Sequence, residues 1–258
     1  MKYDFEFFEK IYKNYNKRNL VKPDPLQVLY DYKEVEDRAV IALLASGLAY
    51  GRVKQILKSI DRILVKLGKN PVEFIMNNSI VEFRDVFKGF KHRFTDELEI
   101  AMFCEGIKNA IEKYGSLKNA FLDGYSNRDD NIIPALDAFS KKITANFPRG
   151  KSYLFPAPVN GSACKRPMLF LRWMVRSDEV DPGGWDEISP SKLIIPLDTH
   201  MYAFAKGAGF TKRKSADLKT ACEISGYFKQ LNSRDPVKYD FAITRFGIRE
   251  ELSTKSLS

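Results

Sequence analysis

Hydrophobic residues recur at three- and four-residue steps along most of the chain, which is the spacing of one face of an α-helix. The first such stripe joins Phe5, Phe8 and Ile11. A later stripe, in residues 52–67, is followed by Gly68, a typical helix stop. The pattern predicts helices over residues 5–15, 26–32, 34–48, 52–67, 97–114, 132–143, from 164 onward, from 198 to 207 or 209, and 235–249.

Strand signals are scarce in the same sequence. No stretch alternates cleanly between apolar and polar residues over six positions, and no Asn-Gly or Asp-Gly pair separates two strand-like runs. The glycine-rich loops that cradle dinucleotides or nucleoside triphosphates are also missing from the sequence. The predicted fold class is therefore all-α.

Composition adds a positive charge to this helical pattern. The 258 residues carry a formal net charge of +9, with 44% hydrophobic and 29% charged residues, which is a globular balance. A basic protein favours an anionic partner, most simply nucleic acid, because contacts to phosphates release counterions. The three cysteines (Cys104, Cys164 and Cys222) lie far apart without a Cys-x-x-Cys pair. We therefore expect no disulfide framework, no metal or iron–sulfur site, and no cofactor.

Two further features bear on location. The longest uncharged apolar run, residues 39–51, has 13 residues and is too short to cross a bilayer. The first ten residues mix acidic, basic and aromatic side chains and contain no apolar signal core. The expectation is a cytoplasmic protein that does not contact a membrane.

The stretch from residue 156 to residue 209 contains the candidate chemistry. Residues 161–163 are all small and predict a tight turn, after which a helix begins at Cys164. On that helix Lys165, Arg172 and Arg176 share one face. Unpaired N–H groups at the start of a helix can bind a phosphate. The same pattern also describes an ordinary capped helix with a solvated basic face.

A second candidate, Asp198, stands between the apolar run 193–197 and the next predicted helix. Aspartate at this position is a natural N-cap, because its side chain accepts backbone N–H bonds and complements the helix dipole. Taken alone, Asp198 fits a cap better than a catalytic group. His200, two residues later, is by itself typical of a packed or hydrogen-bonded histidine.

Taken together, these blocks resemble the helix-hairpin-helix DNA glycosylase superfamily, which includes endonuclease III and the 8-oxoguanine glycosylases. Residues 161–165 are similar to the hairpin pattern Gly-x-Gly-x-Lys, and residues 197–200 are similar to the block Val-Asp-Thr-His. Residues 42–49 resemble the early buried helix that ends near the DNA. The sequences of residues 165–176 and 196–210 resemble those of a bacterial branch of the superfamily.

Two departures accompany the resemblance. Ala163 stands in place of the second hairpin glycine, and Lys165 and Asp198 are 33 residues apart because of an insert at residues 177–192. The insert either carries specificity for a lesion or partner, or is tolerated surface. The cysteine-ligated cluster of endonuclease III has no counterpart here, so that cofactor is not implied.

The resemblance implies two helical subdomains flanking a basic cleft. Residues 35–150 would form a central helical bundle, and residues 1–34 would pack with residues 151–258, which contain the hairpin. The implied activity is base-excision repair by a DNA glycosylase with Schiff-base lyase activity, acting on an oxidised purine such as 8-oxoguanine. Lys165 would attack the sugar, and Asp198 would stabilise the developing charge. The alternative is a catalytically inactive DNA- or RNA-binding module that keeps the hairpin for phosphate contact.

The remaining site residues follow from motif position. Leu48 or Tyr50 would wedge into the DNA. Lys165 must be neutral to attack, so its pKa would have to be lowered by burial or by a neighbouring cation such as Arg166 or Arg172. The expected partner is double-stranded DNA with a damaged base, bound by a monomer associated with the nucleoid. Expected DNA contacts are Gly161, Ser162, Ala163, Arg166, Arg172, His200, Leu48 and Tyr50, and expected base-pocket aromatics are Trp173, Trp185, Phe204 and Phe246. The aromatic and basic residues 89–94 either line a DNA channel or form a solvated loop.

Overall fold

The computed structural model describes residues 3–248, and these are mostly helical, as predicted. The only paired strands in this part of the chain are β1 (Lys91–His92) and β2 (Thr95–Asp96), which form one antiparallel hairpin. Within the described part of the chain, no helix is long and apolar enough to cross a membrane. The chain divides into two compact units. We call residues 23–160 the central unit, and residues 3–22 with 161–248 the terminal unit.

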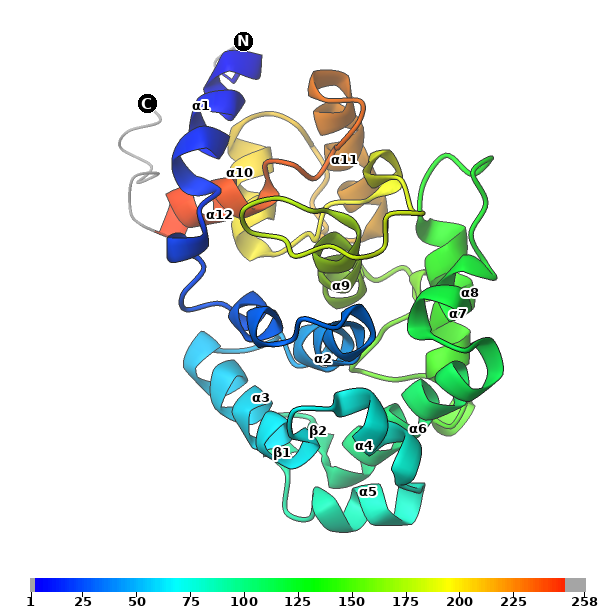
Figure 1. Cartoon of the computed structure of the whole chain (residues 1–258). Helices are drawn as coiled ribbons and strands as arrows, with labels where there is room; N and C mark the ends of the chain where they lie inside the picture. The colour runs from blue at the N-terminus through cyan, green and yellow to red at the C-terminus, as the bar shows by residue number, and fades with distance from the viewer. Residues whose placement is uncertain (1–2, 249–258) are drawn as a thin grey trace. The chain divides into compact units, whose positions relative to one another are not determined.

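The central unit contains the long helices that the hydrophobic pattern predicts. Figure 1 shows α6, α7 and α8 side by side, and α6 also packs against α4 and α5. Its helices are η2 (Pro25–Asp31), α2 (Val35–Gly47), α3 (Val53–Leu67), α4 (Pro71–Asn77), α5 (Ile80–Val86), α6 (Glu97–Tyr114), α7 (Leu117–Leu122), α8 (Ile133–Ile143), η3 (Pro148–Gly150) and η4 (Pro158–Asn160).

Local sequence explains where these helices begin and end. Asp96 caps α6 by accepting the backbone N–H groups of Leu98 and Glu99, while Glu99 reaches back to the N–H of Asp96 in a capping box. Gly115 ends the same helix in the left-handed conformation, with φ +80°. The helix predicted over residues 97–114 is therefore confirmed at both ends.

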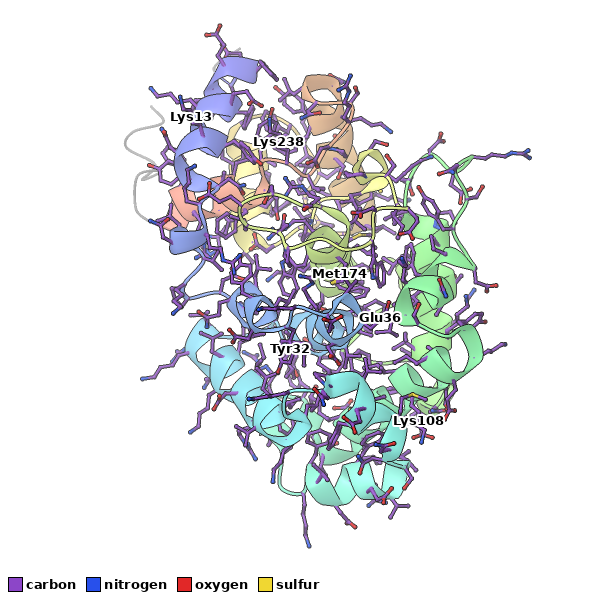
Figure 2. All side chains as sticks on the ribbon, in the orientation of Figure 1. Lys13, Tyr32, Glu36, Lys108, Met174 and Lys238 are labelled. Carbon is purple, nitrogen blue, oxygen red and sulfur yellow. The ribbon has the colours of Figure 1, made fainter. Side chains whose placement is uncertain are left out.

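The terminal unit joins the start of the chain to its last hundred residues. Its helices are α1 (Phe5–Tyr15), η1 (Arg18–Leu20), α9 (Lys165–Val175), η5 (Pro190–Lys192), α10 (Thr199–Gly207), α11 (Leu218–Leu231) and α12 (Asp240–Ile248). α1 packs along α12 (Figure 1), and Phe8 on α1 lies against the rings of Phe228 and Tyr239. Lys238, labelled in Figure 2, binds Glu9 Oε1 at 2.6 Å. These contacts hold the first helix to the end of the chain.

Several elements differ from the prediction. Helices α4, α5, α7 and α11 were not predicted, and the β1–β2 hairpin was not expected because its strands have two residues each. The last helix begins at Asp240 rather than at residue 235, because the Asn232 side chain accepts the N–H of Asp235 in a turn and Pro236 follows. The predicted end of that helix, residue 249, lies outside the described residues.

The unit boundaries also lie elsewhere than the boundaries 34/35 and 150/151 expected from the resemblance. The division falls at 22/23 and 160/161. Residues 25–31 form η2, whose buried Leu26 and Leu29 pack against α2. At the other boundary, the N–H of Val159 donates to Asp137 on α8 at 3.2 Å. Both segments therefore belong with the helices of the central unit.

Candidate functional site

The turn before Lys165 has the backbone conformation that small residues favour. Gly161 has φ +74°, in the left-handed region, and its carbonyl accepts the N–H of Leu218 at 3.3 Å. Ser162 forms a β-bridge with Asp217, and its hydroxyl accepts the N–H of Cys164. Cys164 is buried and left-handed, with φ +49°, and α9 begins at the next residue. The start of α11 thus holds the turn that presents Lys165.

The chain before the turn departs from a helix-hairpin-helix. Between the end of α8 at Ile143 and the start of α9 at Lys165, the structure contains only the 3-10 turns η3 and η4. The first helix of the expected motif is therefore absent as an α-helix. Of the elements that the motif predicts, the described residues contain the turn and the helix that follows it.

Lys165 is half-exposed at the first position of α9. Its amine has no hydrogen bond or ion pair to the part of the chain that the structure describes. The neighbouring Gly161 and Ser162 are exposed and Ala163 is half-buried. Phe170 and Met174, on the opposite side of α9, are fully buried and fix the helix in the unit. The amine is thus accessible while the helix that carries it is anchored.

Asp198 is the N-cap of α10, as the sequence predicts. Its Oδ1 accepts the N–H of Met201 at 2.8 Å. Its Oδ2 makes no hydrogen bond within residues 3–248 and remains available to a ligand. The buried run before it is held by α11, where Ser225 Oγ accepts the N–H of Ile195 at 2.9 Å. His200 is exposed on the first turn of α10.

A buried ionic cluster lies behind Asp198 in the terminal unit. Arg172 pairs with Asp181 and with Asp240, and all three are almost fully buried. Burial raises the pKa of Asp240 to about 6; the Arg172 guanidinium opposes this rise, and the carboxylate of Asp198 adds to it. The cap of α10 is therefore electrostatically coupled to this cluster.

The predicted contact of Arg172 with DNA is wrong. Its side chain is only 5% exposed, and both ends of its guanidinium are occupied by aspartates. Arg176 is buried in the same way, and its guanidinium pairs with Asp178, Asp181 and Asp235. Helical spacing correctly put the two arginines on one face of α9, but that face is covered. Arg166 is half-buried at the second position of α9, and its predicted role stays a prediction.

The insert at residues 177–192 provides the cover. Figure 1 shows the segment between α9 and α10 passing around α9, and the N–H groups of Gly183 and Trp185 donate to the carbonyls of Trp173 and Met174. Trp185 meets Phe170 edge to face at 5.1 Å. The insert is thus a structural part of the unit's core, which neither expectation for it foresaw.

These contacts also overturn two predicted base-pocket residues. Trp173 is 1% exposed and Trp185 is 0% exposed. Both indoles are fully buried, so they cannot line an open pocket. Phe204 and Phe246 are half-buried: Phe204 packs against Tyr3, and Phe246 lies 5.4 Å from the ring of Tyr15. Their pocket role stays a prediction.

The two candidate wedges lie in the central unit and differ in access. Leu48 is 1% exposed at the end of α2, so it is wrong as a wedge because no part of its side chain projects outward. Tyr50 is half-buried, and its hydroxyl donates to the carbonyl of His92 at 2.8 Å. Its ring edge meets Tyr153 at 4.9 Å. Tyr50 therefore belongs to a surface aromatic group.

Sequence reasoning missed a basic loop beside the turn. Residues 211–217 connect α10 to α11, and Tyr202 on α10 donates to the carbonyl of Arg213. Arg213 itself binds Asp217, the residue that bridges to Ser162. Lys212 and Lys214 on either side of it are exposed. The run of three basic residues was visible in the sequence, but its place next to residues 161–162 was not.

A family model described as "Protein of unknown function (DUF2400)" matches residues 24–249. The chain belongs to the DUF2400 family. The DUF2400 match spans nearly all of the central unit and includes both the Lys165 turn and Asp198. No curated protein and no solved structure matches the chain.

Proposed function

We propose that this DUF2400 protein is a DNA base-excision glycosylase with an associated Schiff-base lyase activity, acting on an oxidised purine such as 8-oxoguanine. One observation carries the proposal. The terminal unit presents an accessible amine, Lys165, at the start of one helix and a carboxylate with a free oxygen, Asp198, at the start of another. An amine nucleophile and a carboxylate are the two groups that this reaction needs.

The proposed chemistry assigns one role to each group. The Lys165 amine forms a bond to C1′ of the damaged nucleotide, while the bond from C1′ to the base breaks and its electron pair leaves with the base. Asp198 stabilises the positive charge that develops on the sugar. Loss of the proton from nitrogen and opening of the sugar ring leave a Schiff base, and removal of a 2′ proton then expels the 3′ phosphate.

The charge distribution supports DNA as the substrate. The chain has a net charge of +9, and the exposed Lys212 and Lys214 flank the turn that leads to Lys165. Positive side chains beside a helix start favour phosphate contacts. The proposed partner is double-stranded DNA with a damaged base, bound by a monomer. A cytoplasmic, nucleoid-associated location belongs to the same proposal.

The test is trapping of the covalent intermediate. Duplexes with a single 8-oxoguanine, uracil or abasic site are incubated with the protein and borohydride, and a protein–DNA adduct is expected on one of them. Lys165→Ala and Lys165→Arg should both abolish the adduct, because arginine keeps the charge but does not deprotonate to attack. Asp198→Asn should slow adduct formation at least about tenfold while leaving stability unchanged, since asparagine is an equally good N-cap.

A second function, a nucleic-acid-binding module without catalysis, is supported by the exposed Lys212 and Lys214 on the loop that bridges to the turn, since phosphate contact needs only positive charge. If no adduct forms on any of the substrates, the lyase mechanism is ruled out. If Lys165→Arg then binds duplex DNA as tightly as the unmodified protein, the module is the better account. Release of free base without an adduct would instead indicate a glycosylase that uses water.

A further inference from the structure

The central unit exposes a cluster of aromatic rings at one end of its hairpin. Phe94 is 62% exposed and Tyr153 is 45% exposed, and their ring centroids are 5.5 Å apart. Tyr50 meets the other side of Tyr153 at 4.9 Å. Because Phe94 and Tyr153 keep about half or more of their surface exposed, their rings are accessible to a ligand despite these contacts. Large exposed aromatic groups of this kind mark interaction sites.

A buried polar group holds the rings in place. His92, 2% exposed, bonds through Nδ1 to Ser59 Oγ at 2.9 Å and through Nε2 to the carbonyl of Tyr50 at 3.1 Å. The Tyr50 hydroxyl in turn donates a hydrogen bond to the carbonyl of His92 and lies 2.8 Å from Thr95 Oγ1. This arrangement fixes the backbone on both sides of Phe94. A preformed surface loses little conformational entropy when a ligand binds.

Positive charge surrounds the same rings. Arg93, at the tip of the hairpin, has φ +54°, and its guanidinium carbon lies 5.5 Å from the centre of the Phe94 ring. Its side chain runs against Gly51, where an added Cβ would lie 2.9 Å from Arg93 Cδ. Arg52 and Lys151, two positions from Tyr50 and Tyr153 in the sequence, are exposed. The cluster therefore offers flat apolar faces together with cations.

We propose that Phe94 and Tyr153, supported by Tyr50 and flanked by Arg93, form a stacking surface for unpaired nucleobases of a DNA strand. Flat aromatic faces flanked by cations match a ligand that has planar bases and an anionic backbone. Inside a duplex the base faces are stacked on one another, so only a single-stranded or extruded base can reach these rings. This inference does not depend on catalysis by Lys165, since all its residues belong to the central unit.

The experiment compares two single-stranded DNA probes of equal length. One contains a central 2-aminopurine among ordinary bases, and the other has the three central bases replaced by tetrahydrofuran abasic analogues. Binding should quench the 2-aminopurine fluorescence. Phe94→Ala and Tyr153→Ala should each weaken binding of the first probe about tenfold and leave the second nearly unchanged. Phe5→Ala is the matched control, because Phe5 is 51% exposed in the terminal unit.

The outcomes separate this inference from the proposed function. Equal weakening on both probes would show a backbone contact and overturn base stacking. Unchanged binding by Phe94→Ala and Tyr153→Ala, or an equal loss in Phe5→Ala, would overturn it as well. Phe94 is exposed, so its variant should unfold at the same temperature as the unmodified protein. The trapping experiment reads a covalent adduct on Lys165, whereas the two probes read base contacts of the central unit, so either result can fail without the other.

Discussion

At the scale of single residues, Asp178 shows how the insert stabilises the terminal unit. Its Oδ1 accepts the N–H groups of Val180 and Asp181, and its Oδ2 accepts hydrogen bonds from Arg176 and from the Tyr12 hydroxyl at 3.0 Å. Burial alone would raise the pKa of Asp178, but Arg176 and the two N–H groups hold it below its usual value. The ionised carboxylate therefore stabilises the folded state.

This predicts a pH-dependent effect of Asp178→Asn. A carboxyl whose folded pKa is lowered contributes stability above its ordinary pKa of 3.8, and loses it as the pH falls through the folded value. The variant should lose about 2 kcal/mol of unfolding free energy at neutral pH. In urea unfolding, the difference in unfolding free energy between the variant and the unmodified protein should be constant from about pH 7 to 5 and should shrink below about pH 4.

The control for this prediction is the next residue. Glu179 pairs with Lys17 at 2.8 Å, but the two side chains are 49% and 42% exposed. Exposed ion pairs contribute little, so Glu179→Gln should leave the free energy of unfolding nearly unchanged. Equal effects of the two substitutions would contradict the role given to Asp178.

At the scale of elements, glycines show where helices touch and where they do not. A Cβ on Gly106 of α6 would lie 2.0 Å from the carbonyl oxygen of Ile143, at the end of α8. The two helices pack closely only because this position has no side chain. Gly226 lies in the middle of α11, is exposed, and has open space around its Cα. There the glycine only lowers helix stability.

Opposite effects of alanine are therefore expected at the two positions. Gly106→Ala should destabilise the protein by about 2 kcal/mol or more, because α8 must move. Gly226→Ala should stabilise it by about 0.5–1 kcal/mol, since alanine restricts the unfolded chain and favours the helix. Thermal and urea unfolding of both variants measure this. A Gly106→Ala variant as stable as the unmodified protein would show that α6 and α8 are not packed as described, and a destabilised Gly226→Ala would contradict the open space at that position.

At the scale of the whole molecule, the chain has a net charge of +9, and two of its exposed lysines lie on the loop 211–217. The loop 211–217 is held rigidly, since Thr220 donates to the carbonyl of Ser215 at 2.6 Å and Arg213 binds Thr220 Oγ1 at 2.8 Å. Lys212 and Lys214 project from this loop beside the Gly161 turn. If the turn contacts a phosphate backbone, these two lysines contribute specific contacts as well as general charge.

The salt dependence of DNA binding tests this assignment. The double variant Lys212→Glu with Lys214→Glu should reduce the slope of log affinity against log salt by about 2, because each lost phosphate contact removes about 0.9. Lys10→Glu with Lys229→Glu alters two other exposed lysines of the terminal unit and changes the net charge equally. Fluorescence anisotropy with a duplex over a salt series measures both. Matching slopes in the two variants would rule out a specific role for the loop.

Much of the fold was predictable because its signals are local. The helices over 53–67 and 97–114 follow from apolar spacing and from caps that adjoin them in sequence. The same holds for Asp198, whose place before α10 identifies it as an N-cap whatever else it does. The short hairpin at residues 91–96 escaped prediction because two-residue strands carry no periodic pattern.

The sequence by itself determined the helical class, the turn before Lys165 and the cap at Asp198, since each depends on residues within one or two helical turns. Only the tertiary structure decided which polar and aromatic groups are accessible. Arg172 is buried because Asp240, 68 residues later, and Asp181 of the insert close over it. Helical spacing tells which residues share a face, but what covers that face depends on segments that are distant along the chain.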